Sequence, residues 1–174
     1  MTNKHRDVTC NQCDDGMMVY VGDHIAEVYK CKQCGNVDEV DTTDHADDQW
    51  RDRSRMHYTD PVDAWTESVT LFDHGYDAEV ARYHHPSRIT FLMKRSNIVT
   101  CIHTPSARYV GQRAAIQAMI RVDASNVKIA NLVNECGINR TGFEQIVEHM
   151  NRTEPGDGPA GTQPRRNQHS RSET

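Results

Sequence analysis

Apolar residues recur with a helical period in residues 106–122, where small side chains share one face. Ser106 is a suitable N-cap residue, because its hydroxyl can accept a backbone N–H of the first helical turn. The stripe that follows comprises Ala107, Gly111, Ala114, Ala115, Ala118, Met119 and Val122. Small side chains on a buried face let neighbouring helices approach closely. The pattern therefore predicts a central helix with other helices packed around it.

Two further helices are predicted in residues 127–150, with a turn between them. The first covers residues 127–135, and Gly137 then suits the left-handed conformation that ends many helices. The second begins at Asn139. The apolar positions of this pair are Ile129, Leu132, Val133, Cys136, Phe143, Ile146, Val147 and Met150. This spacing is typical of a helix-turn-helix, although any two helices of an all-helical domain can share it.

Two cysteine pairs enclose a strand-like stretch near the N-terminus. Cys10-Asn-Gln-Cys13 and Cys31-Lys-Gln-Cys34 are separated by 17 residues whose pattern is typical of a β-hairpin. Four thiolates in this order predict one structural Zn²⁺, with no vacant coordination position for catalysis. Two other interpretations are weaker. Disulfides would need an oxidising compartment, and a redox-active C-x-x-C would be expected once instead of twice.

These patterns divide the chain into four parts. Residues 8–41 are predicted to form a small β zinc ribbon, and residues 42–60, which have few aliphatic side chains, an acidic linker. Residues 61–152 are predicted to form an all-α domain that carries the helix-turn-helix. Residues 153–174 are rich in Pro, Gly and polar side chains and are predicted to be a disordered tail. Because the predicted metal site is closed, it cannot activate water, and any catalysis must be sought elsewhere in the chain.

The formal net charge of −5 conceals a separation of charge along the chain. Residues 38–79 carry 13 acidic residues and three arginines, whereas residues 81–122 carry seven basic residues and no acidic one. The basic segment predicts a surface for nucleic-acid phosphates, with Arg113 and Arg121 contributing from the central helix. The alternative is that these bases neutralise the acidic segment of the same molecule.

The second helix of the predicted helix-turn-helix offers candidates for reading DNA. Arg140, Thr141 and Gln145 are the side chains expected to face a groove and contact base edges. Glu144 and Glu148 share this surface and would repel phosphates, which weakens the interpretation.

In its order of elements the chain resembles the transcription factor IIB family, whose archaeal member is transcription factor B. The resemblance rests on the cysteine pairs, on the acidic stretch that leads to Gln49-Trp50-Arg51, and on the last three predicted helices, which are similar to the end of a cyclin-like repeat. It implies a transcription initiation factor whose zinc ribbon docks on RNA polymerase, with Trp50 and Arg51 as partner-binding residues. It also implies a function without catalysis, so the protein is expected not to be an enzyme and to have no small-molecule substrate, with a cyclin-like domain on promoter DNA beside the TATA-binding protein. The chain departs from the family in one respect, because the family has two cyclin-like repeats and this chain has room for one.

Two other functions stay open from the sequence. A DNA-binding regulator would use the same helix-turn-helix without polymerase. An HNH-like nuclease would use His84-His85, Asn97 and His103 around a divalent metal, although the gap from Asn97 to His103 is short. Trp50 also has two interpretations, because a lone Trp in an acidic segment either inserts into a partner or folds back on the ribbon.

The composition also bears on where the protein acts. No apolar stretch approaches the roughly 18 residues that a membrane-spanning helix needs, so no membrane partner is expected. The residues after Met1 show no apolar signal segment, which predicts an intracellular protein. Its place would be the cytoplasm of a prokaryote or host cell, or the nucleus of a eukaryote.

Overall fold

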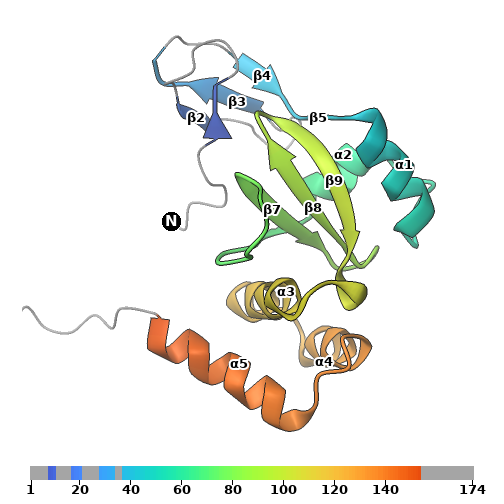
Figure 1. Cartoon of the computed structure of the whole chain (residues 1–174), viewed down its shortest axis with the longest axis vertical. Coiled ribbons are helices and arrows are strands. Elements are labelled where there is room, and N and C mark those ends of the chain that lie inside the picture. Colours follow the sequence, from blue (N-terminus) through green and yellow to red (C-terminus); the bar gives the residue numbers. More distant parts are fainter. Residues whose placement is uncertain (1–7, 11–16, 21–27, 34–36, 154–174) are drawn as a thin grey trace, which may run out of the picture.

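The computed structural model describes residues 8–10, 17–20, 28–33 and 37–153. Within them, the N-terminal part forms a four-stranded antiparallel sheet in the order β1-β2-β3-β4 (Figure 1). Its strands are β1 (Val8–Thr9), β2 (Met17–Tyr20), β3 (Val28–Cys31) and β4 (Val37–Glu39). The hydroxyl of Thr9 donates to Oε1 of Glu79 over 2.6 Å, which connects this small sheet to the rest of the protein.

A mixed five-stranded sheet forms the centre of the protein, in the order β5-β9-β8-β7-β6. β5 runs parallel to β9, and the other pairs are antiparallel. Arg95 and Ser96 connect β8 to β9 with φ angles of 49° and 66°, the left-handed pair that a tight hairpin turn needs. The strands are β5 (Asp41–Thr42), β6 (Val69–Thr70), β7 (Val80–His84), β8 (Ile89–Lys94) and β9 (Asn97–His103).

Helices lie beside the sheet and at one of its ends (Figure 1). α1 (Asp44–Arg53) packs along β9, and α2 (Pro61–Thr66) packs against β7. The hydroxyl of Thr43 caps α1 by accepting the N–H of Ala46, and the carboxylate of Asp60 caps α2 by accepting the N–H of Val62. At the end of the sheet lie η1 (Thr104–Ser106), α3 (Tyr109–Arg121), α4 (Asn126–Glu135) and α5 (Arg140–Thr153).

Two hydrophobic clusters hold these layers together. Neighbouring residues of a strand point to opposite faces, and so Phe91 belongs to one cluster and Leu92 to the other. In the first cluster the rings of Trp50 and Phe91 stack with centroids 5.4 Å apart, and Trp65 meets Phe91 edge-on at 6.1 Å. The second cluster joins β7 to α3, α4 and α5 through residues such as Tyr83. The core is thus built around β7 and β8.

The predicted fold class, a zinc ribbon followed by an all-α domain, is wrong. Residues 61–152 contain four of the five strands of the central sheet. All residues of β7 are buried, and so are the first five residues of β8. Strands covered on both faces lack the alternation of polar and apolar residues that reveals a strand in a sequence. β7 also contains Arg82 and His84 among its buried side chains, which makes its pattern harder to recognise.

Residues 42–60 are not an extended linker either, because they begin in β5 and contain α1. Most of α1 is acidic or basic, and its buried residues are Ala46 and Trp50. These two lie four residues apart, on the one face of the helix that meets the sheet. A single apolar pair is too weak a pattern to distinguish a packed helix from a solvated acidic segment.

The C-terminal helices lie close to where the apolar period predicted them. α3 and α4 cover the predicted ranges to within about two residues. Gly137 has a φ of 68°, the left-handed value expected between α4 and α5. The predicted disordered tail, from residue 154 onwards, lies outside the described residues. Among the helices that the structure describes, none is long and apolar enough to cross a membrane.

Gly111 in α3 allows Tyr76 to approach the helix closely. A Cβ atom at Gly111 would lie 1.8 Å from the hydroxyl oxygen of Tyr76 and 2.5 Å from its Cζ. Gly111→Ala is therefore expected to lower the free energy of unfolding by about 1–3 kcal/mol, since the ring must move. Urea unfolding should also show that Gly111→Ala lowers the free energy of unfolding by less in a Tyr76→Phe background, because the closest atom, the hydroxyl oxygen of Tyr76, is then missing. An equal cost in both backgrounds would contradict this contact.

Candidate active site

The turn between β7 and β8 places ionisable side chains on both sides of the sheet. It is short, comprising His85-Pro86-Ser87-Arg88, and Arg88 has a φ of 63°. A non-glycine residue in the left-handed region stores strain, a feature that is common at functional sites. On one side Nδ1 of His84 lies 2.8 Å from Oγ of Ser87, which fixes the start of the turn. On the other side, His85 and Arg88 face α4.

A salt-bridged pair connects this turn to the C-terminal end of α4. Arg88 Nε donates to Oε2 of Glu135 over 2.7 Å, and its Nη2 donates to Oε1 over 3.1 Å. The hydrogen bond from Arg88 holds the pKa of Glu135 below its ordinary value. Arg55, which follows α1, lies 3.5 Å from the same carboxylate. Two guanidinium groups therefore converge on one carboxylate, and the local charge stays positive.

His85 lies beside this pair and is held by a tyrosine. Nδ1 of His85 is 3.4 Å from the hydroxyl of Tyr83, which is nearly fully buried. Burial lowers the pKa of His85 to about 4, and the charges of Arg88 and Lys128 act in the same direction, against Glu135. Burial raises the pKa of Tyr83 above its usual range. At neutral pH both groups are uncharged, and the imidazole can accept a proton.

A second histidine lies at the end of β9. Nδ1 of His103 is 2.9 Å from Oγ of Ser106 in η1. Burial lowers the pKa of His103, helped by the charge of Arg55 and opposed by that of Glu135. Its electrostatic partners are thus the two residues that also surround Arg88. We call Arg55, Tyr83, His85, Arg88, His103 and Glu135 the turn site.

The turn site combines fixed positive charge with neutral imidazoles. Arg55, Arg88 and Lys128 contribute three positive charges against the one negative charge of Glu135. Guanidinium groups bind phosphate oxygens, and a neutral imidazole can accept a proton. The arrangement suits a phosphodiester substrate, because the guanidinium groups can stabilise its negative charge and the imidazole can accept a proton at the same site.

The buried state of His85 has a consequence for stability. In the unfolded chain the imidazole takes up a proton below its ordinary pKa of 6.5, whereas in the folded protein it does so below about 4. Between these values the unfolded state binds more protons, so the free energy of unfolding should fall as the pH is lowered. We expect a loss of roughly 1–2 kcal/mol, reduced by the partial exposure of the ring.

Urea unfolding at pH 7 and pH 4.5 measures this effect, with His85→Gln as the comparison. The variant removes the imidazole and should show a weaker dependence on pH than the wild-type protein. His84 and His103 also have lowered pKa values, and they add the same pH dependence of stability to the wild type and to His85→Gln. A variant whose stability depends on pH as steeply as the wild type would contradict the burial of a neutral His85.

The predicted zinc site is not supported by the part of the chain that the structure describes. Cys10 and Cys31 are buried, whereas Cys13 and Cys34 lie outside the described residues. Across residues 8–10, 17–20, 28–33 and 37–153, no group of three or more His, Cys, Asp or Glu side chains could hold a metal ion. The structure thus contradicts the predicted Zn²⁺ as a cofactor, and the turn site, far along the chain, replaces it as the candidate site.

The residues predicted to bind partners have different positions. Trp50 is 2% exposed, and its Nε1 donates to the carbonyl of Thr59 over 2.9 Å, so its ring belongs to the protein's own core. Arg51 is exposed and lies 3.8 Å from Asp48. A role for Arg51 in binding a partner stays a prediction.

The residues predicted to read DNA lie on α3 and α5. Thr141 and Gln145 are exposed on α5, where Arg140 donates to Glu144 over 2.9 Å. Arg113 is partly buried in α3, and Arg121 at its end lies over the ring of Phe72. Their DNA-binding roles stay predictions. In the basic segment, Lys94 pairs with Asp77 of the acidic segment, whereas Arg88 pairs with Glu135 outside it and Arg82 donates to a backbone carbonyl.

The HNH-like motif is only partly assembled. His84, His85 and His103 meet at one end of the sheet, because the register pairs His84 with Ile89 and Ile89 with His103. Asn97 begins β9 and therefore lies at the opposite end of the sheet. Sequence reasoning missed Arg55, Tyr83, Arg88 and Glu135. The one available signal was the run His84-His85-Pro86-Ser87-Arg88, which places chemically active side chains around a proline turn.

One family model matches the chain. Residues 42–105 are similar to the family described as "Putative RelE superfamily toxin domain". The match covers less than half of the 174 residues. It begins in β5 and ends in η1, and so it spans α1, α2 and the central sheet except for Asp41. No curated protein and no solved structure matches the chain.

This match corrects the functional prediction. The resemblance to the transcription factor IIB family is wrong, because the family model that matches is a toxin domain and covers the segment predicted to be a polymerase-directed linker. The transcription-initiation function that followed from the resemblance is wrong with it. Nothing tests RNA polymerase, promoter DNA or the TATA-binding protein as partners, and they stay predictions from the sequence.

Proposed function

We propose that residues 42–105 form a toxin domain of the RelE type that cleaves RNA at the turn site. The matched segment contains α1, α2 and the central sheet except for Asp41 of β5. RelE-like toxin domains are often ribonucleases. Five of the six turn-site residues lie inside the matched segment, and only Glu135 comes from α4.

The observation that carries this proposal is the meeting of Arg88, Arg55 and His85 around Glu135. In the proposed reaction a guanidinium group binds the scissile phosphate and stabilises the charge that develops on it. Arg88 is 7% exposed and held by three hydrogen bonds, two to Glu135 and one from Nη1 to the carbonyl of His85, so its position is fixed before the substrate arrives. Glu135 prevents two neighbouring cations from repelling each other in the absence of RNA.

The chemistry needs no group beyond the RNA, these side chains and solvent water. The 2′-oxygen of the substrate attacks the adjacent phosphorus, and the bond from phosphorus to the 5′-oxygen breaks. Neutral His85 accepts the proton of the 2′-hydroxyl, and the leaving 5′-oxygen takes a proton from solvent water. The products are a 2′,3′-cyclic phosphate and a 5′-hydroxyl. The expectation that the chain is not an enzyme is untested, and this proposal departs from it.

Arg88→Gln is the substitution that tests the proposal. It removes the charge but keeps a side chain that can hydrogen-bond to Glu135, and RNA cleavage should fall by about 10²–10³-fold. Cleavage of a labelled RNA, both alone and in a cell-free translation extract, provides the measurement. Arg51→Gln is the matched control, because Arg51 is exposed on α1. The Arg51→Gln protein should cleave RNA as the wild type does. Equal cleavage by Arg88→Gln and the wild-type protein would refute the proposed role of the turn.

A further inference from the structure

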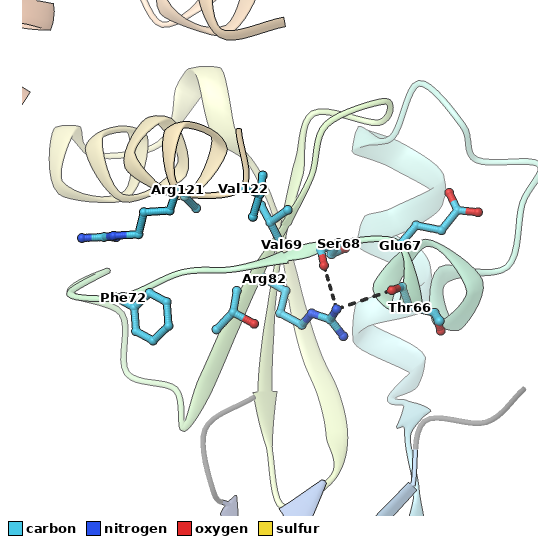
Figure 2. Close-up of a pocket in the computed structure, with 10 residues that line it drawn as sticks. Thr66, Glu67, Ser68, Val69, Phe72, Arg82, Arg121 and Val122 are labelled. Carbon is cyan, nitrogen blue, oxygen red and sulfur yellow. Dashed lines mark hydrogen bonds between the residues drawn. The ribbon is translucent and has the colours of Figure 1, made fainter. Parts of the chain in front are cut away.

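A hollow of about 460 Å³ lies at the β6 edge of the sheet, near the end of α3 (Figure 2). Its walls come from the end of α2, from β6, from β7 and from the last turn of α3. A volume of this size accommodates a small organic ligand or one unit of a polymer. The walls are largely apolar, with Val69, Val122 and Ala118 among them, and charged groups lie around them.

One side of the hollow pairs an aromatic ring with a cation. Cζ of Arg121 lies 5.6 Å from the centroid of the Phe72 ring. In Figure 2 these two side chains lie on the same side of the hollow, away from Thr66 and Glu67. A flat aromatic ligand can stack on a Phe ring and on a guanidinium plane. This combination favours a planar, polarisable group over an aliphatic chain.

The opposite side is polar and held in place. Arg82 is 3% exposed and donates from Nη2 to the carbonyls of Ser68 at 2.7 Å and Thr66 at 3.4 Å (Figure 2). Its Cζ also lies 5.0 Å from the centroid of the Trp65 ring. The guanidinium group is thus fixed by the fold, so the hollow is already formed before any ligand enters it.

The hollow adjoins the strand that carries the turn site. Val69 in its wall pairs with Tyr83 in the register of β6 and β7. Glu67, at the rim, has its Oε2 atom 3.6 Å from Nε2 of His84, the residue next to His85. The hollow and the turn site therefore both border β7.

We propose that this hollow, lined by Phe72, Arg82 and Arg121, is a nucleobase subsite that binds one purine of the RNA substrate. This inference rests on the proposed RNA cleavage for its place in the reaction, but the binding itself does not require cleavage. Stacking on Phe72 and Arg121 supplies the affinity. A purine offers a larger face for stacking than a pyrimidine, so purines are favoured.

The test uses nucleosides, which carry no phosphate and so do not bind through the charges of the turn site. Adenosine and uridine are titrated separately into the full chain, and binding is followed by NMR chemical-shift changes. Adenosine should bind more tightly than uridine. Phe72→Leu keeps an apolar side chain but removes the aromatic face, and adenosine binding should weaken by about 5- to 150-fold.

Tyr58→Leu is the matched control, because Tyr58 is an aromatic residue that is 76% exposed and outside the hollow. It should bind adenosine like the wild type, and both variants are checked for a wild-type unfolding transition. Failure of the wild type to bind adenosine, or equal binding by Phe72→Leu and the wild type, would overturn the subsite.

An RNA-cleavage assay of the wild-type chain, beside the adenosine titration, distinguishes failure of the purine subsite from failure of the proposed ribonuclease function. RNA cleavage without adenosine binding would reject the subsite and leave the ribonuclease standing. Adenosine binding that depends on Phe72, in a chain that cleaves no RNA, would support the hollow as a purine site and reject the ribonuclease.

Discussion

Replacing His85 by Ala is expected to lower the rate of RNA cleavage by about 10²–10⁴-fold, the usual contribution of a general acid or base. His85 is the neutral imidazole nearest to Arg88 in the chain, and burial, which lowers its pKa to about 4, keeps it unprotonated at pH 7. The ring is only partly buried, and its one described side-chain hydrogen bond is a long one to Tyr83. The fold should therefore tolerate its loss.

Initial rates of cleavage at pH 7, measured beside the thermal unfolding transition, distinguish a catalytic loss from an unfolded protein. His57→Ala is the matched control, because His57 is an exposed histidine in the loop after α1. It should cleave RNA at the wild-type rate. If His85→Ala retained the wild-type rate with an unchanged unfolding transition, His85 would not be the proton acceptor.

Replacing Trp50 by Ala should have the largest effect on stability. The indole is 2% exposed, stacks on Phe91 and donates a hydrogen bond to the carbonyl of Thr59. Its removal leaves a cavity between α1 and the sheet and an unsatisfied carbonyl, and the free energy of unfolding should fall by about 3–5 kcal/mol. Urea unfolding followed by circular dichroism gives the value directly.

Tyr58→Ala provides the comparison for Trp50→Ala. Tyr58 is exposed, and its loss should change the free energy of unfolding by no more than about 0.5 kcal/mol. The pair also tests the interpretation, left open by the sequence, that Trp50 inserts into a partner. A Trp50→Ala variant as stable as Tyr58→Ala would mean that the indole is not part of the core and is available to a partner.

The C-terminal helices were predictable because their signals are local. The small residues of α3 repeat every three or four positions, and Gly137 occupies a left-handed position that few other residues accept. Ser125 caps α4 by accepting the N–H of Lys128, a contact within one helical turn. Each of these features can be read within a window of about ten residues.

The central sheet was not predictable because its stability comes from distant contacts. β5 has two residues and exists through its parallel pairing with β9, more than 50 residues later. Arg82 sits inside a strand because two backbone carbonyls and the face of Trp65 satisfy its charge. Neither the pairing nor the burial of this arginine leaves a periodic pattern in the sequence.

The candidate site was predicted in part. His84, His85 and His103 were singled out from the sequence, but for a metal-dependent motif whose Asn97 lies at the other end of the sheet. The residues that give the histidines their chemistry were missed. Arg88 meets Glu135 from 47 positions away, and Arg55 reaches the same carboxylate from 80 positions away. Sequence spacing shows no relation among them.

The ends of the RNA fragments provide the most direct test of cleavage at the turn site. The full wild-type chain is incubated with a defined RNA, free and in a translation extract, and the fragment ends are identified by mass spectrometry. We expect 2′,3′-cyclic phosphate and 5′-hydroxyl ends, which the His85→Ala protein should not produce. Intact RNA after incubation with folded wild-type protein under both conditions would contradict the proposal that this domain is a ribonuclease.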